Sequence, residues 1–198
     1  MNSSGVVEPV RSFIAIELPD GLKIELRQLI ARLKSANQPW VKWVDPDGIH
    51  LTLKFLGNVA ADKIESVIRA MEEAARDVSP FQLKVGGLGV FPNLRQVRVV
   101  WVGTTGDVDK LTRLQQNIEA YVAPLGFPTE SRSFSAHLTL ARLREPVDIE
   151  ERQEFGNLIA STKFEATSTI EVKTISLMRS QLTRAGAIYS CIASVKLR

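Results

Sequence analysis

The chain has 198 residues, of which 44% are apolar and 24% are charged, and its formal net charge at pH 7 is +3. This balance is typical of a folded globular protein and excludes a disordered or fibrous chain. The most apolar stretch, residues 97–102, is interrupted by Arg98, so we predict no membrane span. The first ten residues lack the basic start and apolar core of a secretory signal, so we expect a cytoplasmic protein.

A single cysteine, Cys191, excludes an internal disulfide and favours a reducing compartment. It lies in an apolar alternation over residues 188–192. At such a position we expect a buried small side chain rather than a nucleophile.

Hydrophobic periodicity alternates between two and 3.6 residues along the chain, which is typical of an α/β or α+β protein. We expect strands over residues 12–17, 40–44, 49–56, 81–85, 96–102, 134–143 and 187–197, and one or two more within 164–182. We expect helices over residues 20–33, 62–75, 107–122 and 148–160, with Asp20 and Asp148 as N-caps. Residues 37–39 are expected to end the first helix. No linker divides the chain, so residues 1–198 are predicted to form a single domain.

Residues 86–92, Gly-Gly-Leu-Gly-Val-Phe-Pro, are expected to form a loop between two strands. They lack the Gly-Lys-Ser/Thr ending of a phosphate-cradling loop. We therefore interpret these glycines as a turn or β-bulge that carries no chemistry.

Both histidines of the chain lie in the same tetrapeptide, His-Leu-Thr-Leu, at residues 50–53 and 137–140, and the two copies are 87 residues apart. Each copy precedes a predicted helix with an aspartate near its start, Asp62 or Asp148. The chain is therefore predicted to consist of two related halves with an internal pseudo-twofold.

Because side chains alternate along a strand, the histidine and threonine of each copy share one face and the two leucines share the other. The leucines are expected in the core. The histidine and threonine lie roughly 6.6 Å apart along the strand, close enough to contact one small anion. Two copies facing each other would surround a pocket with two imidazoles and two hydroxyls.

Cleavage of a phosphodiester needs a base on one side of phosphorus and an acid on the other. Two imidazoles with ordinary pKa values near 6.5 can supply both near neutral pH. We therefore predict His50 and His137 as the catalytic pair, and Thr52 and Thr139 as hydrogen-bond donors to nonbridging phosphate oxygens.

The histidines have two alternative interpretations, a structural role and a metal site. A single histidine on a strand is more often a structural hydrogen-bonding residue, but the same motif around both histidines favours catalysis. A metal site is disfavoured because neither motif contains Cys, Asp or Glu, and His-x-Thr offers no close second ligand. We therefore expect no metal and no cofactor.

Further segments accompany the two motifs in a fixed order. They are residues 11–19, 87–92, 98–103, 126–127, 132–134 and 177–182, with Tyr189 near the end. Together with the motifs they resemble the two-histidine (2H) phosphoesterases, most closely the RNA 2′,3′-cyclic phosphodiesterases of bacteria and archaea, formerly called 2′-5′ RNA ligases. That family commonly has proline before the second histidine, where this chain has Ala136.

The resemblance implies an α+β, bilobal, pseudo-twofold fold in which two antiparallel sheets, flanked by helices, meet at a central cleft. It implies opening of 2′,3′-cyclic phosphate ends of RNA to 2′-phosphates without a metal, and in some members reversible 2′-5′ ligation. By analogy with the family, His50 is the general acid on the leaving 3′-oxygen and His137 is the base for water.

The resemblance also assigns Arg142 to the phosphate and Phe55 to the base. Each lies five residues after a histidine, where strict alternation points its side chain to the opposite face. We therefore expect a bend or a strand end in both strands. Without the resemblance, Arg142 could be a surface charge and Phe55 a core residue.

The expected partners are RNA ends or nucleotides that carry a 2′,3′-cyclic phosphate, with tRNA halves among them, and the protein is expected to be a monomer. The alternative is a non-catalytic RNA-end or nucleotide-binding protein that uses the same anion pocket. Histidine favours catalysis, because Lys or Arg would serve binding equally well and histidine is suited to proton transfer.

Overall fold

The computed structural model describes residues 8–34, 38–144, 146–184 and 186–198. Its strands are β1 (Val10–Glu17), β2 (Val41–Trp43), β3 (His50–Val59), β4 (Phe81–Phe91), β5 (Val99–Gly106), β6 (His137–Leu143), β7 (Glu165–Val172), β8 (Thr174–Leu182) and β9 (Ala187–Lys196). Its helices are α1 (Asp20–Leu33), α2 (Ile64–Ala75), α3 (Val108–Val122) and α4 (Ile149–Ser161), with 3₁₀ turns η1 (Pro46–Gly48), η2 (Ala61–Lys63) and η3 (Ala123–Leu125). The expected order of strands and helices is confirmed.

Some expectations concern residues outside the described ranges. The lack of a secretory signal rests largely on residues 1–7, and part of the expected end of the first helix lies in residues 35–37. Within the described part, α1 ends at Leu33. No helix in the described ranges is both long and apolar enough to cross a membrane.

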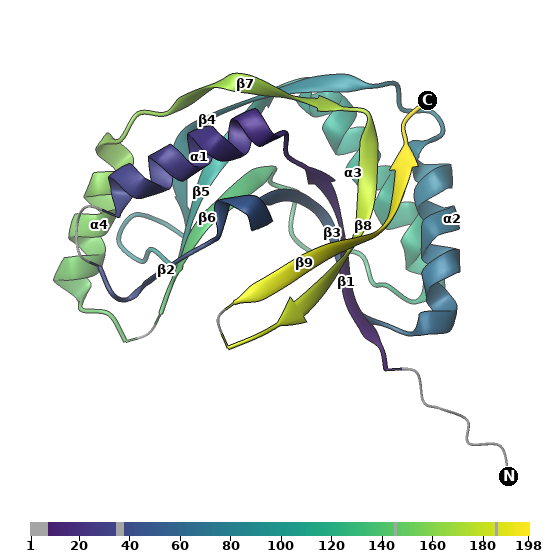
Figure 1. The fold of residues 1–198 in the computed structure, drawn as a ribbon, viewed down its shortest axis with the longest axis horizontal. Helices are drawn as coiled ribbons and strands as arrows, with labels where there is room; N and C mark the ends of the chain where they lie inside the picture. The colour runs from purple at the N-terminus through teal and green to yellow at the C-terminus, as the bar shows by residue number, and fades with distance from the viewer. Residues whose placement is uncertain (1–7, 35–37, 145, 185) are drawn as a thin grey trace, which may run out of the picture.

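The strands form one antiparallel sheet in the order β7-β4-β5-β6-β3-β1-β8-β9, with β2 paired to β6. The sheet curls into an arch (Figure 1). At its centre, β3 and β6 pair through Leu51 and Leu138. The two sheets that the resemblance implies are therefore the two halves of one sheet, joined where the two His-Leu-Thr-Leu motifs meet.

The two halves correspond to each other across that junction, β3-β1-β8-β9 on one side and β6-β5-β4-β7 on the other. One helix from each half packs against the other half. Helix α1 follows β1 in the chain and contacts β7, whereas α3 follows β5 and contacts β3. In contrast, α2 contacts β9 and α4 contacts β4. Figure 1 accordingly shows α1 and α4 beside one half and α2 and α3 beside the other. The α+β, bilobal, pseudo-twofold fold is confirmed.

The apolar face expected for the first helix is buried in full: Leu22, Leu26, Leu29, Ile30 and Leu33 are each at most 3% exposed. The four leucines of the two motifs are also at most 3% exposed. Burial of each such side chain stabilises the fold by about 1.5–3 kcal/mol. Since the leucines face the core, the histidines and threonines of the motifs must face the other side of the sheet.

Of the segment expected to be a loop at residues 86–92, residues 86–91 are instead part of a continuous strand, β4, and Pro92 follows its end. Its ladder with β5 shifts register between Gly86 and Leu88, so the glycines form a bulge, as their spacing allowed. The strand continues because β5 offers hydrogen-bond partners as far as Phe91. At Gly89 the indole of Trp101 occupies the space that a Cβ atom would need. A glycine is required there for close packing rather than for a turn.

The two expected N-caps differ. Asp148 caps α4 as predicted, since its carboxylate accepts a hydrogen bond of 2.8 Å from the backbone N–H of Glu150. The prediction for Asp20 is wrong, because Pro19 is the N-cap and Asp20 is the first helical residue. Oδ1 of Asp20 instead lies 3.7 Å from Nζ of Lys23, one turn further along the helix.

The prediction that Cys191 is buried is wrong. Its side chain is exposed, and its Sγ atom lies 3.4 Å from Oγ of Ser194. The apolar alternation around it is real, but β9 is an edge strand and has a partner on one side, β8. An edge strand leaves much of its surface to solvent whatever its sequence pattern.

Candidate active site

A β-bulge in each motif strand brings Phe55 and Arg142 to the face of the histidines. In the β1–β3 ladder, Thr52 pairs with Ala15 and Lys54 pairs with Ile14, so Leu53 is the extra residue. In the β5–β6 ladder, Thr139 pairs with Trp101 and Ala141 pairs with Val100, so Leu140 is the extra residue. The expected interruption of both strands is therefore confirmed, and it lies at the same distance from each histidine.

At each bulge two consecutive side chains are buried and the next one is exposed, which is the pattern expected when an extra residue is inserted into a strand. Leu53 and Lys54 are both buried, and the next residue, Phe55, is 43% exposed. Leu140 and Ala141 are likewise both buried, and Arg142 is exposed. Phe55 is therefore not a core residue.

The antiparallel pairing at the junction interleaves the two motifs. Because Leu51 lies opposite Leu138, His50 lies beside Thr139, and Thr52 lies beside His137. Adjacent strands are about 4.8 Å apart and residues rise about 3.3 Å along a strand, which places the Cα atoms of the two histidines roughly 8 Å apart. Two imidazoles at this separation can approach one phosphate from two sides.

Both imidazoles are anchored in the same way. Nδ1 of His50 donates to the carbonyl oxygen of Gly48 at 2.8 Å, and Nδ1 of His137 donates to that of Ser135 at 2.7 Å. A carbonyl oxygen can only accept, so each Nδ1 carries a hydrogen. Nε2 of each ring is therefore the nitrogen that gains or loses a proton, which is the requirement for a general acid or base.

His50 is packed tightly by aromatic rings. Phe13 stacks on its imidazole at 4.4 Å between ring centroids, and Tyr189 meets it edge-on at 4.9 Å. Phe13 and Tyr189 belong to a small apolar cluster, separate from the main core, that also holds Ala15 and Met178. Burial lowers the pKa of His50, and the bond to Gly48 and the charge of Glu17 oppose this effect in part.

His137 has a looser aromatic environment. Phe91 meets its ring edge-on at 5.1 Å, and Trp101 lies tilted at 6.4 Å. Neither ring stacks on the imidazole as Phe13 does on His50. The pseudo-twofold thus repeats the backbone anchor of the histidines but not the packing of their rings.

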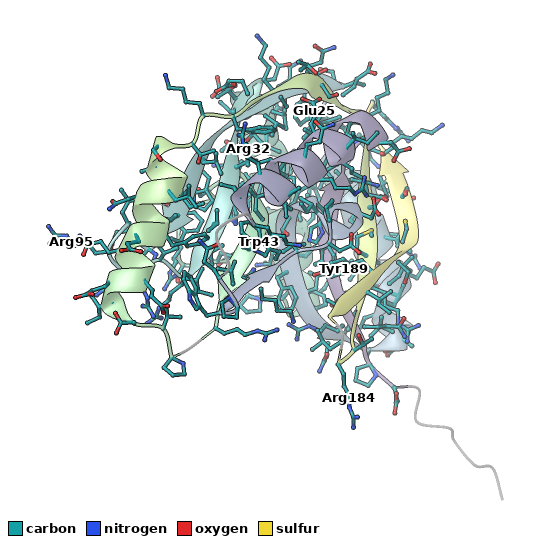
Figure 2. All side chains as sticks on the ribbon, turned by 60° about the vertical axis from the view of Figure 1, so that its left-hand side comes forward. Glu25, Arg32, Trp43, Arg95, Arg184 and Tyr189 are labelled. Carbon is teal, nitrogen blue, oxygen red and sulfur yellow. The ribbon has the colours of Figure 1, made fainter. Side chains whose placement is uncertain are left out.

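A cavity of about 820 Å³ lies on this face, and we call it the cleft. It is lined by four of the six predicted site residues, His50, Thr52, Phe55 and Arg142. The other two, His137 and Thr139, adjoin it through the strand pairing described above. Figure 2 shows two further lining residues, Trp43 of β2 and Tyr189 of β9, both below α1.

Several residues that the sequence did not predict also line the cleft. The Arg11 guanidinium lies over the ring of Phe55, 4.6 Å from its centroid. Lys42 enters the lining from β2. Both are charged side chains on strands, where alternation predicts only that they avoid the core. Arg11 belongs to a segment that supports the family resemblance, but that segment gave it no role, and nothing in the sequence distinguishes Lys42 from other surface charges.

Metal ligands do not converge in the described part of the chain. No group of three or more His, Cys, Asp or Glu side chains within it lies close enough to hold a metal ion.

Comparisons with known proteins agree with this arrangement. The chain matches the family model described as LigT like Phosphoesterase over residues 16–101 and again over residues 102–189. It is 35% identical over 181 residues to an RNA 2′,3′-cyclic phosphodiesterase of Methanothermobacter thermautotrophicus, with 91% of this chain and 95% of the relative covered. It is 30% identical over 180 residues to the protein of the same name from Archaeoglobus fulgidus, with 91% and 96% covered.

Solved structures give the same result. The protein TT0787 of Thermus thermophilus superposes with a TM-score of 0.77 at 26% identity, covering 95% of this chain and 98% of that one. E. coli LigT in complex with 3′-AMP superposes with a TM-score of 0.71 at 25% identity, covering 96% and 99%. The family match spans both halves of the chain, one motif in each, and the chain therefore belongs to the family of LigT-like phosphoesterases.

Proposed function

We propose that this protein is an RNA 2′,3′-cyclic phosphodiesterase, which hydrolyses 2′,3′-cyclic phosphate ends of RNA or nucleotides to 2′-phosphates without a metal. The observation that carries the proposal is the pair of histidines, each anchored through Nδ1 and placed on adjacent strands of one face. The names of the relatives support the same reaction. Residues 1–198 would act as one domain, since the cleft takes residues from both halves.

In the proposed reaction, Nε2 of His137 takes a proton from water, and the water oxygen forms a bond to phosphorus. The bond from phosphorus to the 3′-oxygen breaks on the opposite side, and Nε2–H of His50 protonates the departing oxygen. The product carries a 2′-phosphate and a 3′-hydroxyl. The assignment of acid and base follows the family resemblance, and either histidine could take either role by geometry alone.

The remaining site residues would act on the phosphate and the base. The hydroxyls of Thr52 and Thr139 would donate to nonbridging oxygens, where bonds to a charged acceptor contribute about 1.5–3 kcal/mol each. The Arg142 guanidinium would stabilise the charge that develops on phosphorus oxygens. The ring of Phe55 would stack on the nucleobase.

The alternative, a binding protein without turnover, fits the site less well. Binding of an anion alone would be served equally well by lysine or arginine, which keep their positive charge at every physiological pH. Two imidazoles on adjacent strands, each held through Nδ1 so that Nε2 is left for exchange, are suited to proton transfer.

We extend the same proposal to ligation, to the natural substrates, and to the oligomeric state and location of the protein. Attack by a 5′-hydroxyl in place of water would give 2′-5′ ligation through the same groups. RNA ends, tRNA halves among them, would be the natural substrates. The protein would act as a monomer in the cytoplasm, where its exposed single thiol would stay reduced.

The proposed reaction is tested by incubating the pure protein with each 2′,3′-cyclic nucleoside monophosphate in the presence of EDTA and identifying the product. We expect the 2′-monophosphate, at a rate that the chelator does not change, because the acid and base are side chains. Inhibition by EDTA that added metal reverses would contradict the metal-free mechanism. Formation of the 3′-monophosphate would contradict the direction of cleavage.

Phe55→Ala is expected to raise the KM for a cyclic nucleotide by about 5- to 150-fold while kcat changes little, because base stacking contributes about 1–3 kcal/mol to binding. The ring is 43% exposed, so its removal should cost much less stability than the about 3–5 kcal/mol of a buried phenylalanine. Tyr121→Ala is a matched control, since Tyr121 is 46% exposed on α3 and outside the cleft. A sharply lower Tm with an unchanged KM would assign Phe55 to the fold instead.

A further inference from the structure

Two positive side chains face each other across adjacent strands in the cleft. In the β2–β6 ladder, Lys42 lies directly opposite Arg142, and both line the cleft. Like charges in directly opposite positions destabilise a sheet. Within the described residues, no ion pair supplies either side chain with a carboxylate. This arrangement is unfavourable in the free protein and becomes favourable when anions lie between and beside the two cations.

The rest of the cleft lining is positive as well. Lys34, at the C-terminal end of α1, and Arg11, on β1, also line it. The acidic residue in the lining is Asp45, whose carboxylate already accepts a hydrogen bond from the backbone N–H of Asp47. The whole chain is nearly balanced, with 25 basic and 22 acidic residues, so the cleft concentrates the positive charge.

This charge exceeds what one phosphate requires. If Arg142 contacts the cyclic phosphate, as proposed above, then Lys42 and Lys34 are left over, and no ion pair among the described residues gives either lysine a carboxylate. These surplus cations therefore point to a substrate with a second phosphate, which is longer than one nucleotide.

We propose that Lys42, together with Lys34, forms a second phosphate subsite that binds the phosphodiester on the 5′ side of the terminal nucleotide. With the RNA ends proposed above as substrates, this subsite would hold the next phosphodiester along the chain, and a mononucleoside cyclic phosphate would occupy only part of the cleft. Because the subsite contacts the backbone and not base edges, it makes RNA binding stronger without reading sequence. This inference rests on the proposed function for the position of the cyclic phosphate at Arg142.

The test compares two substrates with the same terminal nucleoside, a mononucleoside 2′,3′-cyclic phosphate and a dinucleotide that ends in a 2′,3′-cyclic phosphate. We expect the wild-type kcat/KM to favour the dinucleotide by about tenfold or more, the effect of one charge-assisted phosphate contact. In Lys42→Ala this ratio should fall towards one, and in Lys42→Arg it should be retained. Lys42 is exposed, so its truncation is not expected to unfold the protein.

Salt dependence gives a second readout. One additional phosphate contact to a single strand steepens the fall of log affinity with log salt by about 0.7. We expect this extra slope for the dinucleotide over the mononucleotide in the wild type and its loss in Lys42→Ala. Arg95→Ala is the matched control, because it removes an exposed arginine outside the cleft, far from Trp43 and Tyr189 in Figure 2, and should keep both the ratio and the slope.

Equal kcat/KM values for the two substrates in the wild type would overturn the subsite, and so would a ratio that Lys42→Ala leaves intact. Hydrolysis of neither substrate would instead contradict the proposed function. The two failures are therefore distinguishable in one set of assays.

Discussion

Replacement of either histidine by alanine is expected to lower kcat for a 2′,3′-cyclic nucleotide by about 10²–10⁴-fold, the usual contribution of a general acid or base. Both losses are expected because Nδ1 of each ring is held by a backbone carbonyl, which leaves Nε2 for proton transfer, and the proposed reaction needs one imidazole on each side of phosphorus. The rates of His50→Ala, His137→Ala and the double variant are measured with one substrate. A double variant no slower than the singles would fit two groups that act as one unit.

A substrate with a leaving group of low pKa separates the two roles. Such a leaving group departs without protonation, so it should restore activity to His50→Ala and not to His137→Ala. Circular dichroism provides the control for folding, which matters most for His50 because Phe13 and Tyr189 pack against its ring. Rescue of His137→Ala alone would reverse the assignment of acid and base.

The pH profile depends on the same pair. One imidazole must be neutral and the other protonated, so kcat/KM should follow a bell-shaped curve. Burial lowers the pKa of His50, so an acid at this position loses its proton at a lower pH than a free histidine would. The descending limb of the profile should therefore lie at a lower pH than it would for an unburied histidine acid. A substitution that loosens the packing of Phe13 or Tyr189 on His50 should move this limb back to higher pH. A rate that rises steadily to high pH would exclude the pair.

Arg142→Ala is expected to lower kcat by about 10²–10³-fold, comparable to the loss of one preorganised oxyanion donor. The guanidinium would contact the phosphate most strongly when charge accumulates in the transition state, so kcat should fall together with kcat/KM. Phe55→Ala should affect mainly KM, because the stacking of the ring on the base is the same in the ground state and in the transition state. Arg142→Lys should recover only part of the rate, since a lysine cannot bind two oxygens in parallel.

Arg144→Ala is the matched control for this variant. Arg144 is also an exposed arginine, lies just beyond the end of the same strand and is not part of the cleft lining. Its variant should retain wild-type kinetics. If Arg142→Ala raises KM alone, Arg142 contributes to binding and the chemical step does not depend on it.

Several features could be predicted from the sequence because they depend on local chemistry. The helical period of apolar residues in α1 predicted each of the residues that the helix buries. Alternation within His-Leu-Thr-Leu predicted which side chains enter the core, and repetition of the motif predicted the pseudo-twofold. The catalytic assignment of the two histidines also came from the sequence, as a prediction that the kinetics above would test.

Other features were decided by the tertiary structure, because they depend on partners that are distant in sequence. Residues 86–91, which were expected to form a loop, form a strand because they pair with β5. The exposure of Cys191 depended on its place at the edge of the sheet. The bulges at Leu53 and Leu140 became definite only in the ladders with β1 and β5.

The cleft shows most clearly what depends on strand pairing rather than on local sequence. Lys42 and Arg142 are 100 positions apart in the sequence and face each other because β2 pairs with β6. His50 and His137 share a face because Leu51 pairs with Leu138. Local residue chemistry determined what each strand could offer to the site, whereas the pairing of strands, which is a non-local choice among many registers, decided which groups meet.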